Sequence, residues 1–296
     1  MTEAMDRKEY GDFATIGLPL DYELYGKYKV KEYVSMGHIN LVYLAVNKVS
    51  QKKVLIKEFC PYEYANRDLD RVHVVCKGRA CRKQYDQACA LFAKECEIHK
   101  LISKYPEKKR KNIVKFIECF EENGTKYLVL EYIPGQDLKS YIQIVPNLQF
   151  ISIAKEIVRA VKQIHAMGIL HKDIKPSNLI VGDDGHIYII DFGTADKCNA
   201  CKDEYPFVSK GFSAPELYRL EMLSKQTDIY SLGAIFYYLL TGRVLQSADQ
   251  RLVKDQVIPI SADVSIPWLL EWGIMKCVRL DPNKRWKHLA IYSLLL

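Results

Sequence analysis

Four side chains able to do chemistry recur at short spacing in the sequence ILHKDIKPSNLIVGDDGHIYIIDFG. Asp173, Lys175 and Asn178 belong to one polar segment, and Asp191 follows a short apolar run. The apolar run is typical of a strand, and the preceding GDDG is typical of a tight turn. We therefore expect the polar segment and the strand end to lie side by side, which would bring Asp173, Asn178 and Asp191 to one spot.

These groups suit phosphoryl transfer. The reaction needs oxygen ligands for Mg²⁺, a group that orients a hydroxyl nucleophile, and a cation near the developing phosphate charge. Asn178 and Asp191 would hold the metal. Asp173 would accept the hydroxyl proton, and Lys175 would steady the transferring group. The alternative interpretation is a polar loop beside an incidental DFG sequence.

The sequence HKDIKPSN, followed by DFG, resembles the catalytic loop and metal-binding motif of the eukaryotic-type protein kinases. The resemblance covers the chain from about residue 25 to its end. It implies ATP and Mg²⁺ as cofactors. It also implies an α+β, bilobal fold, with a small antiparallel β-sheet and one helix in the N-lobe and a mainly α-helical C-lobe. The predicted boundaries are an N-terminal tail at 1–22 and a kinase domain at 23–296, with an N-lobe at 23–131, a hinge at 131–135 and a C-lobe at 136–296.

Composition places the chain among ordinary globular proteins. Its 296 residues are 49% hydrophobic and 27% charged, and the formal net charge is +7. No apolar run approaches the length of a membrane helix, and the polar start argues against a signal peptide, so we expect a cytoplasmic protein without a membrane segment. A basic cluster at Lys104–Lys111 is compatible with a solvated loop or with an anion-binding surface. We predict no nucleic-acid partner, and the sequence leaves the oligomeric state open.

The chain has nine cysteines. Cys76 and Cys81 lie five positions apart, and Cys198 and Cys201 form a C-x-x-C sequence. These four residues could ligate Zn²⁺ together, the C-x-x-C could be a redox pair, or all could be plain thiols of a reducing compartment.

The predicted N-lobe begins with three β-rich runs, at 28–34, 41–47 and 53–59, which indicate an antiparallel meander. In the family, the first hairpin covers the nucleotide phosphates through the pattern GxGxxGxV. When its valine is aligned with Val42, the glycine positions are occupied by Ser35, Gly37 and Asn40. Serine and asparagine are less suited than glycine to a close backbone approach to phosphate.

Lys57 ends the sequence VLIK, which resembles the VAIK motif whose lysine contacts the α- and β-phosphates. Leu55 replaces the small residue that covers the adenine in the family. A helix expected at Gln87–Ile102 would supply the ion-pair partner of the lysine. Glu95 and Glu97 compete for this role, and the pattern FxxExxI selects Glu95.

The stretch between this lysine and the helix is longer than in most kinases. It begins with IKEFCP, and this start with a long linker resembles a group of bacterial serine/threonine kinases. In the helix, His99 replaces a residue that is usually aliphatic. A satisfied core histidine and a ligand or pH-sensing group are the alternatives.

A second hairpin is predicted in FIECFEENGTKYLVLEY, where Asn-Gly joins two strands. The following EYIPG resembles the kinase hinge. The resemblance places adenine contacts on backbone groups of Glu131 and Ile133 and a gatekeeper at Leu130. It also places a ribose contact at Asp137, and it adds Ile180 to the nucleotide-binding residues.

Periodic apolar residues predict a helix at 149–167, ahead of the catalytic loop. An activation segment follows Gly193 and ends in the sequence APE. In the family, Asp228 holds the backbone of the catalytic loop, and Arg285 pairs with the glutamate of APE. The resemblance assigns structural roles to His171, Phe192, Gly193, Glu216, Asp228 and Arg285.

The predicted activity is transfer of the ATP γ-phosphate to serine or threonine hydroxyls of protein substrates, because a lysine two residues after the catalytic aspartate is typical of serine/threonine kinases. Lys172 stands where the family has an arginine that binds a phosphate of the activation segment, and lysine offers only a point charge. The segment also has few hydroxyls. We therefore expect activation without loop phosphorylation, with Asp203 or Glu204 paired with Lys172.

Two other functions stay open. The reduced glycine pattern favours a pseudokinase scaffold or switch that binds nucleotide weakly, and a kinase of small molecules is the other alternative. The APE segment favours a peptide substrate over a small molecule. The residues whose presence argues against a scaffold are Lys57, Glu95, Asp173, Lys175, Asn178 and Asp191.

Overall fold

The computed structural model describes residue 13 and residues 15–144, 150–198 and 208–289. The chain separates into two compact units. The first comprises Met1–Lys104 and Val114–Pro134, and the second comprises Tyr105–Ile113 and Gly135–Leu296. The change of unit after Pro134 falls within the predicted hinge, while the outer boundaries of the kinase domain stay a prediction.

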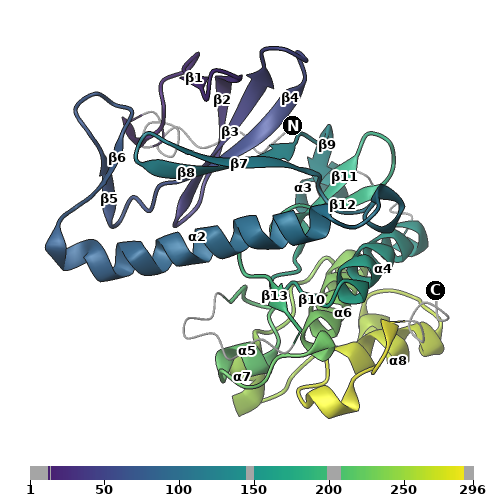
Figure 1. Cartoon of the computed structure of the whole chain (residues 1–296). Helices are drawn as coiled ribbons and strands as arrows, with labels where there is room; N and C mark the ends of the chain where they lie inside the picture. Colours follow the sequence, from purple (N-terminus) through teal and green to yellow (C-terminus); the bar gives the residue numbers. More distant parts are fainter. Residues whose placement is uncertain (1–12, 14, 145–149, 199–207, 290–296) are drawn as a thin grey trace. The chain divides into compact units, whose positions relative to one another are not determined.

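A six-stranded antiparallel sheet forms the framework of the first unit, in the order β1-β2-β3-β4-β8-β7 (Figure 1). Its strands are β1 (Glu23–Leu24), β2 (Tyr28–Met36), β3 (Asn40–Asn47), β4 (Lys53–Phe59), β7 (Phe116–Glu122) and β8 (Thr125–Glu131). Strands β2, β3 and β4 confirm the predicted meander. The predicted Asn-Gly turn joins β7 to β8, and Asn123 and Gly124 both have positive φ, of 54° and 67°.

Part of the predicted N-terminal tail belongs to the core of this unit. Phe13 and Leu18 are fully buried. The Phe13 ring stacks on Tyr33, with 4.6 Å between centroids, and meets Tyr43 edge-on at 5.4 Å. The Leu18 amide donates to the Tyr43 hydroxyl at 3.0 Å. The burial of these two residues was not predicted, because two widely spaced apolar residues give no periodic signal.

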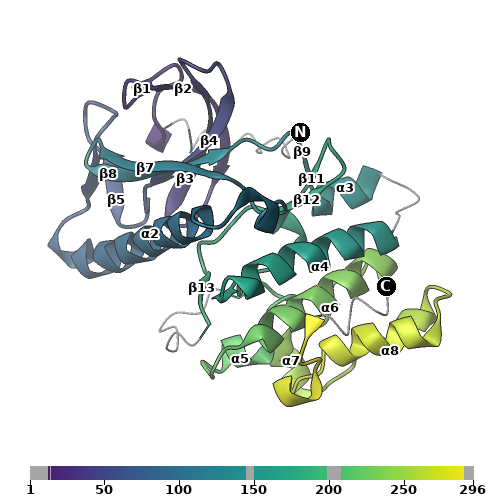
Figure 2. The same cartoon turned by 45° about the vertical axis from the view of Figure 1, so that its right-hand side comes forward.

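One long helix, α2 (Arg82–Ser103), runs along the sheet after the 3₁₀ turn η1 (Arg79–Cys81) (Figures 1 and 2). Helix α2 confirms the helix predicted at Gln87–Ile102 but begins five residues earlier. These first residues, RKQYD, are mostly polar and show no helical repeat of apolar residues. The buried residues of α2 recur at helical spacing and are Ala88, Phe92, Glu95, Cys96, Ile98, His99 and Ile102.

The segment between β4 and α2 is anchored to the sheet. It forms a ladder of β5 (Ala65–Arg67) and β6 (Val74–Cys76). The Val74 amide donates to the Asn123 carbonyl at 2.9 Å. Arg67 pairs with Glu58 of β4, with 2.6 Å between Nη2 and Oε2. This segment, called the insert below, is therefore part of the fold of the first unit.

The second unit is mainly helical (Figure 2). Its α-helices are α3 (Leu138–Ile144), α4 (Phe150–Ala166), α5 (Pro215–Tyr218), α6 (Lys225–Thr241), α7 (Ala248–Val253) and α8 (Trp268–Cys277). Helix α4 confirms the helix predicted at 149–167. Helix α6 packs against α4 and α8; it begins at a capping box of Ser224 and Thr227 and ends at Gly242, whose φ is 68°. No helix in the described residues is long and apolar enough to span a membrane.

Short ladders carry the polar segments of the second unit. Strands β9 (Gly135–Asp137), β11 (Leu179–Gly182) and β12 (Ile187–Ile189) form one sheet, and β10 (Ile169–Leu170) pairs with β13 (Asp196–Lys197). Strand β12 confirms the strand predicted before Asp191. The 3₁₀ turns are η2 (Glu107–Lys109), η3 (Pro176–Asn178), η4 (Ile260–Ala262) and η5 (Pro282–Lys284).

Candidate active site

In the first unit, Lys57 of β4 and Glu95 of α2 form a buried ion pair. Lys57 is 8% exposed and Glu95 is 1% exposed, and 2.6 Å separates Nζ from Oε1. Glu97, the other candidate partner, is exposed. Either charge would be strongly destabilising if it were buried without its partner, so the two side chains keep this contact. The ammonium group of Lys57 is therefore held at a fixed place on the sheet.

The predicted nucleotide-binding side chains share one face of the sheet with Lys57. Val42 pairs with Lys57 across β3 and β4, and Leu55 pairs with Leu130 across β4 and β8. Paired residues of an antiparallel sheet point to the same side, and alternate residues of one strand do as well. An apolar surface therefore flanks the ammonium group, as an adenine base requires.

The turn between β2 and β3 is closed by its own backbone and side chains. The Gly37 amide donates to the Asn40 carbonyl at 2.8 Å, and Ser35 lies opposite Val42 in the ladder. A Cβ atom on Gly37 would lie 2.8 Å from Oδ1 of Asn40. A larger residue at position 37 would therefore make the side chain of Asn40 move.

Of the predicted hinge residues, Glu131 is the last residue of β8 and Ile133 lies just before the end of the first unit. The Glu131 amide donates to the Lys115 carbonyl at 2.9 Å, so the carbonyl of Glu131 is the group to consider for an adenine contact. This contact and that of Ile133 stay predictions.

In the second unit, Asp137 caps the helix that follows it. Its carboxylate accepts the Ser140 amide at 3.0 Å and the Ser140 hydroxyl at 2.7 Å. Its backbone pairs with Ile180 across β9 and β11. A Cβ atom on Gly135 would lie 2.2 Å from the Val181 carbonyl oxygen, so this close approach of the two strands requires glycine. The sheet thus places the predicted ribose contact beside the predicted nucleotide contact of Ile180.

Asp173 is the centre of a polar cluster. Its Oδ2 lies 2.8 Å from Nζ of Lys175 and accepts the side-chain amide of Asn178 at 3.1 Å. Its Oδ1 accepts the hydroxyl of Ser209 at 2.7 Å, and Lys175 donates to the same hydroxyl at 3.1 Å. The sequence gives no signal for the contact of Ser209 with Asp173, because 36 residues separate the two.

Asn178 and Asp191 are brought together by the β11–β12 hairpin. The Ile190 amide donates to the Asn178 carbonyl at 3.2 Å, and Asp191 accepts the Gly193 amide at 3.1 Å. The side-chain nitrogen of Asn178 is engaged with Asp173, so its Oδ1 is the atom that could ligate a cation. An amide oxygen and a carboxylate fit the hard-oxygen preference of Mg²⁺.

The backbone of the predicted catalytic loop is held by Asp228, which is fully buried at the start of α6. Its carboxylate accepts the amides of His171 at 3.0 Å and Lys172 at 2.8 Å, and Nε2 of His165 donates to it at 2.8 Å. Burial opposes its charge, but these hydrogen bonds and the nearby histidines outweigh burial and lower its pKa. Lys172 has a φ of 70°, a strained value for a residue with a side chain, and the Asp228 contact stabilises it.

Lys172 is buried, with Nζ 3.8 Å from a carboxylate oxygen of Asp196 in β13. The predicted partners Asp203 and Glu204 lie outside the described residues. A carboxylate of the chain itself therefore lies beside the lysine at the position where many kinases place an arginine.

Phe192 packs against His171 of this loop. Phe192 is fully buried, and 5.0 Å separates the two ring centroids. Burial lowers the pKa of His171, although nearby carboxylates oppose this effect. The imidazole of His171 is therefore held neutral.

Arg285 and Glu216 form a second buried ion pair, with Nη1–Oε1 at 2.7 Å and Nη2–Oε2 at 2.9 Å. Thr227 donates to the same glutamate at 2.9 Å. The pair joins α5, which begins within the APE sequence, to the residue that follows η5.

The cysteines give no support to the zinc prediction. Among the described residues, no group of three or more His, Cys, Asp and Glu side chains is arranged to hold a metal ion. Cys76, Cys81 and Cys198 are free thiols, and Cys201 lies outside the described residues.

Comparison with known proteins identifies the class. The family model for the protein kinase domain matches residues 28–290. The chain therefore belongs to the protein kinase family. The solved structure "PpkA-294 apo form" aligns with 94% of this chain and 99% of its own, with a TM-score of 0.81 and 23% identity. These findings confirm the predicted kinase-like α+β fold, with an antiparallel sheet in the N-lobe and a helical C-lobe.

The curated relatives include bacterial serine/threonine kinases. The serine/threonine-protein kinase PrkC of Bacillus subtilis is 28% identical over 275 residues, covering 88% of this chain and 39% of the relative. A probable serine/threonine-protein kinase of Clostridium acetobutylicum is 26% identical over 278 residues, covering 90% of this chain and 38% of the relative. The chain therefore spans about two fifths of the length of these relatives, and the predicted resemblance to bacterial serine/threonine kinases is confirmed.

Proposed function

We propose that the chain is a serine/threonine protein kinase that transfers the γ-phosphate of ATP to hydroxyl groups of protein substrates. The observation that carries the proposal is the contact of the Ser209 hydroxyl with Asp173 at 2.7 Å, with the ammonium group of Lys175 at 3.1 Å from the same oxygen. An aliphatic hydroxyl thus already has a carboxylate acceptor and a neighbouring cation, which is what a serine or threonine nucleophile needs.

The residues have separate tasks in this proposal. Asp173 orients the substrate hydroxyl and accepts its proton, and Lys175 stabilises charge on the transferring group. Lys57, fixed by Glu95, binds phosphate oxygens of the nucleotide. Asn178 and Asp191 would hold Mg²⁺, which neutralises charge on the phosphates when bound.

Other parts of the proposal rest on the family alone. Kinases of this family use ATP and Mg²⁺ and act on proteins, which supports the same cofactors and substrate class here. The adenine contacts of the hinge, a cytoplasmic location and the absence of a nucleic-acid partner stay predictions.

The deciding experiment incubates the purified chain with radiolabelled ATP, Mg²⁺ and generic protein substrates, and compares it with Asp173→Ala. We expect label on serine and threonine of the substrates with the wild type and a loss of about 10²–10⁴-fold with the variant. Equal background with both proteins would indicate a scaffold without turnover. Label on a metabolite but not on protein would indicate a small-molecule kinase.

A further inference from the structure

Two cysteines meet in the first unit, where α2 packs against β7. Cys96 lies on the buried face of α2, and Cys119 lies on β7. Both cysteines line the same cavity, and each thiol shifts the pKa of the other through a hydrogen bond. The two residues are distant in sequence but belong to elements that approach closely along their length.

This thiol pair lies in register with the Lys57–Glu95 ion pair. Cys119 pairs with Leu128 of β8, and Leu128 pairs with Lys57 of β4, so Cys119 and Lys57 occupy one row across the sheet. On the helix, Cys96 directly follows Glu95. Helix α2 therefore contacts this row of the sheet at two neighbouring points, one an ion pair and the other a pair of thiols.

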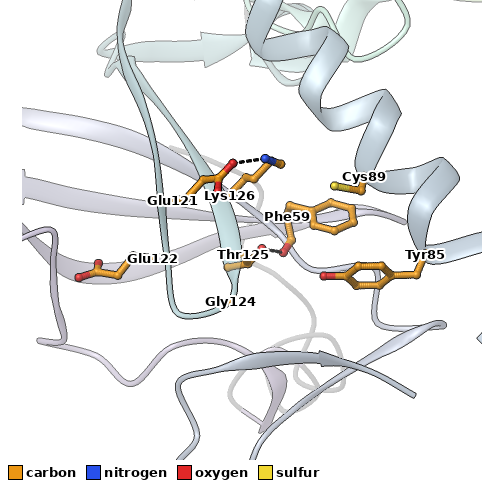
Figure 3. A pocket seen from close by; sticks show the side chains of 8 residues that line it. All are labelled: Phe59, Tyr85, Cys89, Glu121, Glu122, Gly124, Thr125 and Lys126. Carbon is orange, nitrogen blue, oxygen red and sulfur yellow. Dashed lines mark hydrogen bonds and ion pairs between the residues drawn. The ribbon is translucent and has the colours of Figure 1, made fainter. Parts of the chain in front are cut away.

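The thiols can be reached by a small solute. Both line a cavity of about 200 Å³, together with Glu97, Lys100 and Lys126. Lys126 and Glu121, which are ion-paired, also line the neighbouring cavity of about 400 Å³. Figure 3 shows that second cavity, with Cys89 of α2 beside Phe59 and Tyr85.

The surroundings also make one of the two thiols the more reactive. The hydrogen bond from Cys96 lowers the pKa of Cys119, and the charge of Lys100 acts in the same direction, while burial opposes both. The same hydrogen bond raises the pKa of Cys96. A thiolate is the nucleophile in cysteine oxidation, so Cys119 is the sulfur expected to react first.

We propose that Cys96 and Cys119 form a peroxide-sensitive dithiol that closes to a disulfide and fastens α2 to β7 beside the Lys57–Glu95 pair. The Cys119 thiolate attacks a peroxide oxygen, and hydroxide leaves to give a sulfenic acid. Cys96 gives its proton to that hydroxide and attacks the sulfenic sulfur, from which a second hydroxide leaves and takes up the proton first released by Cys119. Two thiols and one hydrogen peroxide thus give one disulfide and two waters.

The disulfide fixes the position that α2 already has, because the two cysteines already line one cavity between packed elements before they react. It closes a loop of more than twenty residues, which restricts the unfolded chain. We expect the oxidised protein to unfold at a temperature higher by roughly 5–10 °C. We also expect slower amide exchange in the part of α2 around Glu95.

The test treats the full chain with hydrogen peroxide, blocks remaining thiols, and maps cysteine-containing peptides by mass spectrometry. We expect a linked peptide pair containing Cys96 and Cys119, reversed by dithiothreitol. The proposal is overturned if peroxide converts these two cysteines to sulfinic acids, or joins either of them to a different cysteine, without forming this link. Neither readout depends on phosphoryl transfer, so failure of the proposed function would not affect it.

The matched variants are Cys119→Ser, Cys96→Ala and Cys89→Ser. The first two should lose the linked peptide and the thermal shift, whereas Cys89→Ser, on the same helix in the neighbouring cavity, should keep both. A thermal shift that persists in both Cys119→Ser and Cys96→Ala would overturn the role of the disulfide even if the wild type forms it.

Discussion

Arg67 and Glu58 form an ion pair through two hydrogen bonds, with Nη1–Oε1 at 2.8 Å and Nη2–Oε2 at 2.6 Å. Glu58 has no exposed surface, and its carboxylate also accepts the hydroxyls of Tyr43 at 2.5 Å and Tyr127 at 2.7 Å. Glu58 follows Lys57 in β4, so the two side chains point to opposite faces of the sheet. The insert that carries Arg67 therefore supports the strand that presents the lysine.

Replacing Arg67 with methionine should lower the free energy of unfolding by about 3–5 kcal/mol, because Glu58 would be left buried without its cation. Denaturant titration of the folded protein measures this change. The double variant Glu58→Gln with Arg67→Met should recover part of the loss. As a control, Lys27→Met removes an exposed ion pair with Glu118 and should lower the free energy of unfolding by less than about 1 kcal/mol. A similar effect at Arg67 and Lys27 would contradict the structural role of the insert.

Replacing Lys57 with methionine should reduce the rate of phosphoryl transfer by about 10²–10³-fold, because a preorganised cation near the phosphates is lost. Nucleotide affinity, measured by titration of a fluorescent ATP analogue, should fall less than the rate. Lys52→Met, in the exposed turn before β4, is the matched control and should behave as the wild type. Equal losses in rate and in affinity would mean that Lys57 acts in binding alone.

Replacing Asp191 with asparagine should abolish Mg²⁺-dependent turnover at ordinary metal concentrations, because a neutral amide is a weaker ligand than a carboxylate. Initial rates across a magnesium titration test this. Asp183→Asn, in the exposed turn before β12, should leave the titration unchanged. Near-normal activity of Asp191→Asn would show that the metal assignment is wrong.

The buried His171 should make stability depend on pH. Burial lowers the pKa of this histidine in the folded state. Its contribution to the free energy of unfolding is therefore fully present above the unfolded pKa of about 6.5 and is lost as pH falls through the folded pKa. Free energies of unfolding should therefore decrease as pH falls below about 6.5. His171→Gln should flatten this dependence, whereas the exposed His186→Gln should not. The same slope in wild type and His171→Gln would rule out this histidine as its source.

We expect activity without phosphorylation of the activation segment, because Asp196 already lies beside Lys172. Phosphatase treatment should leave the initial rate of phosphoryl transfer unchanged. Tyr205→Phe, which removes a hydroxyl from this segment, should leave it unchanged too. Asp196→Asn should lower the rate, since it removes a charge next to a buried lysine. A stoichiometric phosphate in this segment, detected by mass spectrometry and required for activity, would contradict the prediction.

The local motifs predicted contacts within each unit because each motif constrains neighbouring residues. Lys57 ends a strand whose pattern is clear, and the sequence HKDIKPSN fixes Asp173, Lys175 and Asn178 within one loop. The choice of Glu95 over Glu97 followed from the family pattern FxxExxI, and α2 buries Glu95 together with its apolar residues.

Contacts between distant segments were not predictable in the same way. Nothing in the sequence near Arg67 indicates that its partner is Glu58, because both are charged residues of a type usually found on the surface. Asp196 as the neighbour of Lys172 depends on the pairing of β10 with β13, two-residue strands too short to give a periodic signal. The contact of Ser209 with Asp173 likewise depends on how the activation segment returns to the loop.

The burial of Phe13 and Leu18 shows that the start of the family match and the start of the folded core differ. The family model begins at residue 28, which marks the part of the sequence that relatives share. The residues that cover the sheet begin earlier. Phe13 stacks on Tyr33, and the backbone amide of Leu18 donates to the hydroxyl of Tyr43. A chain cut at the first shared residue would expose aromatic rings to solvent, and its poor solubility could be mistaken for a property of the kinase domain itself.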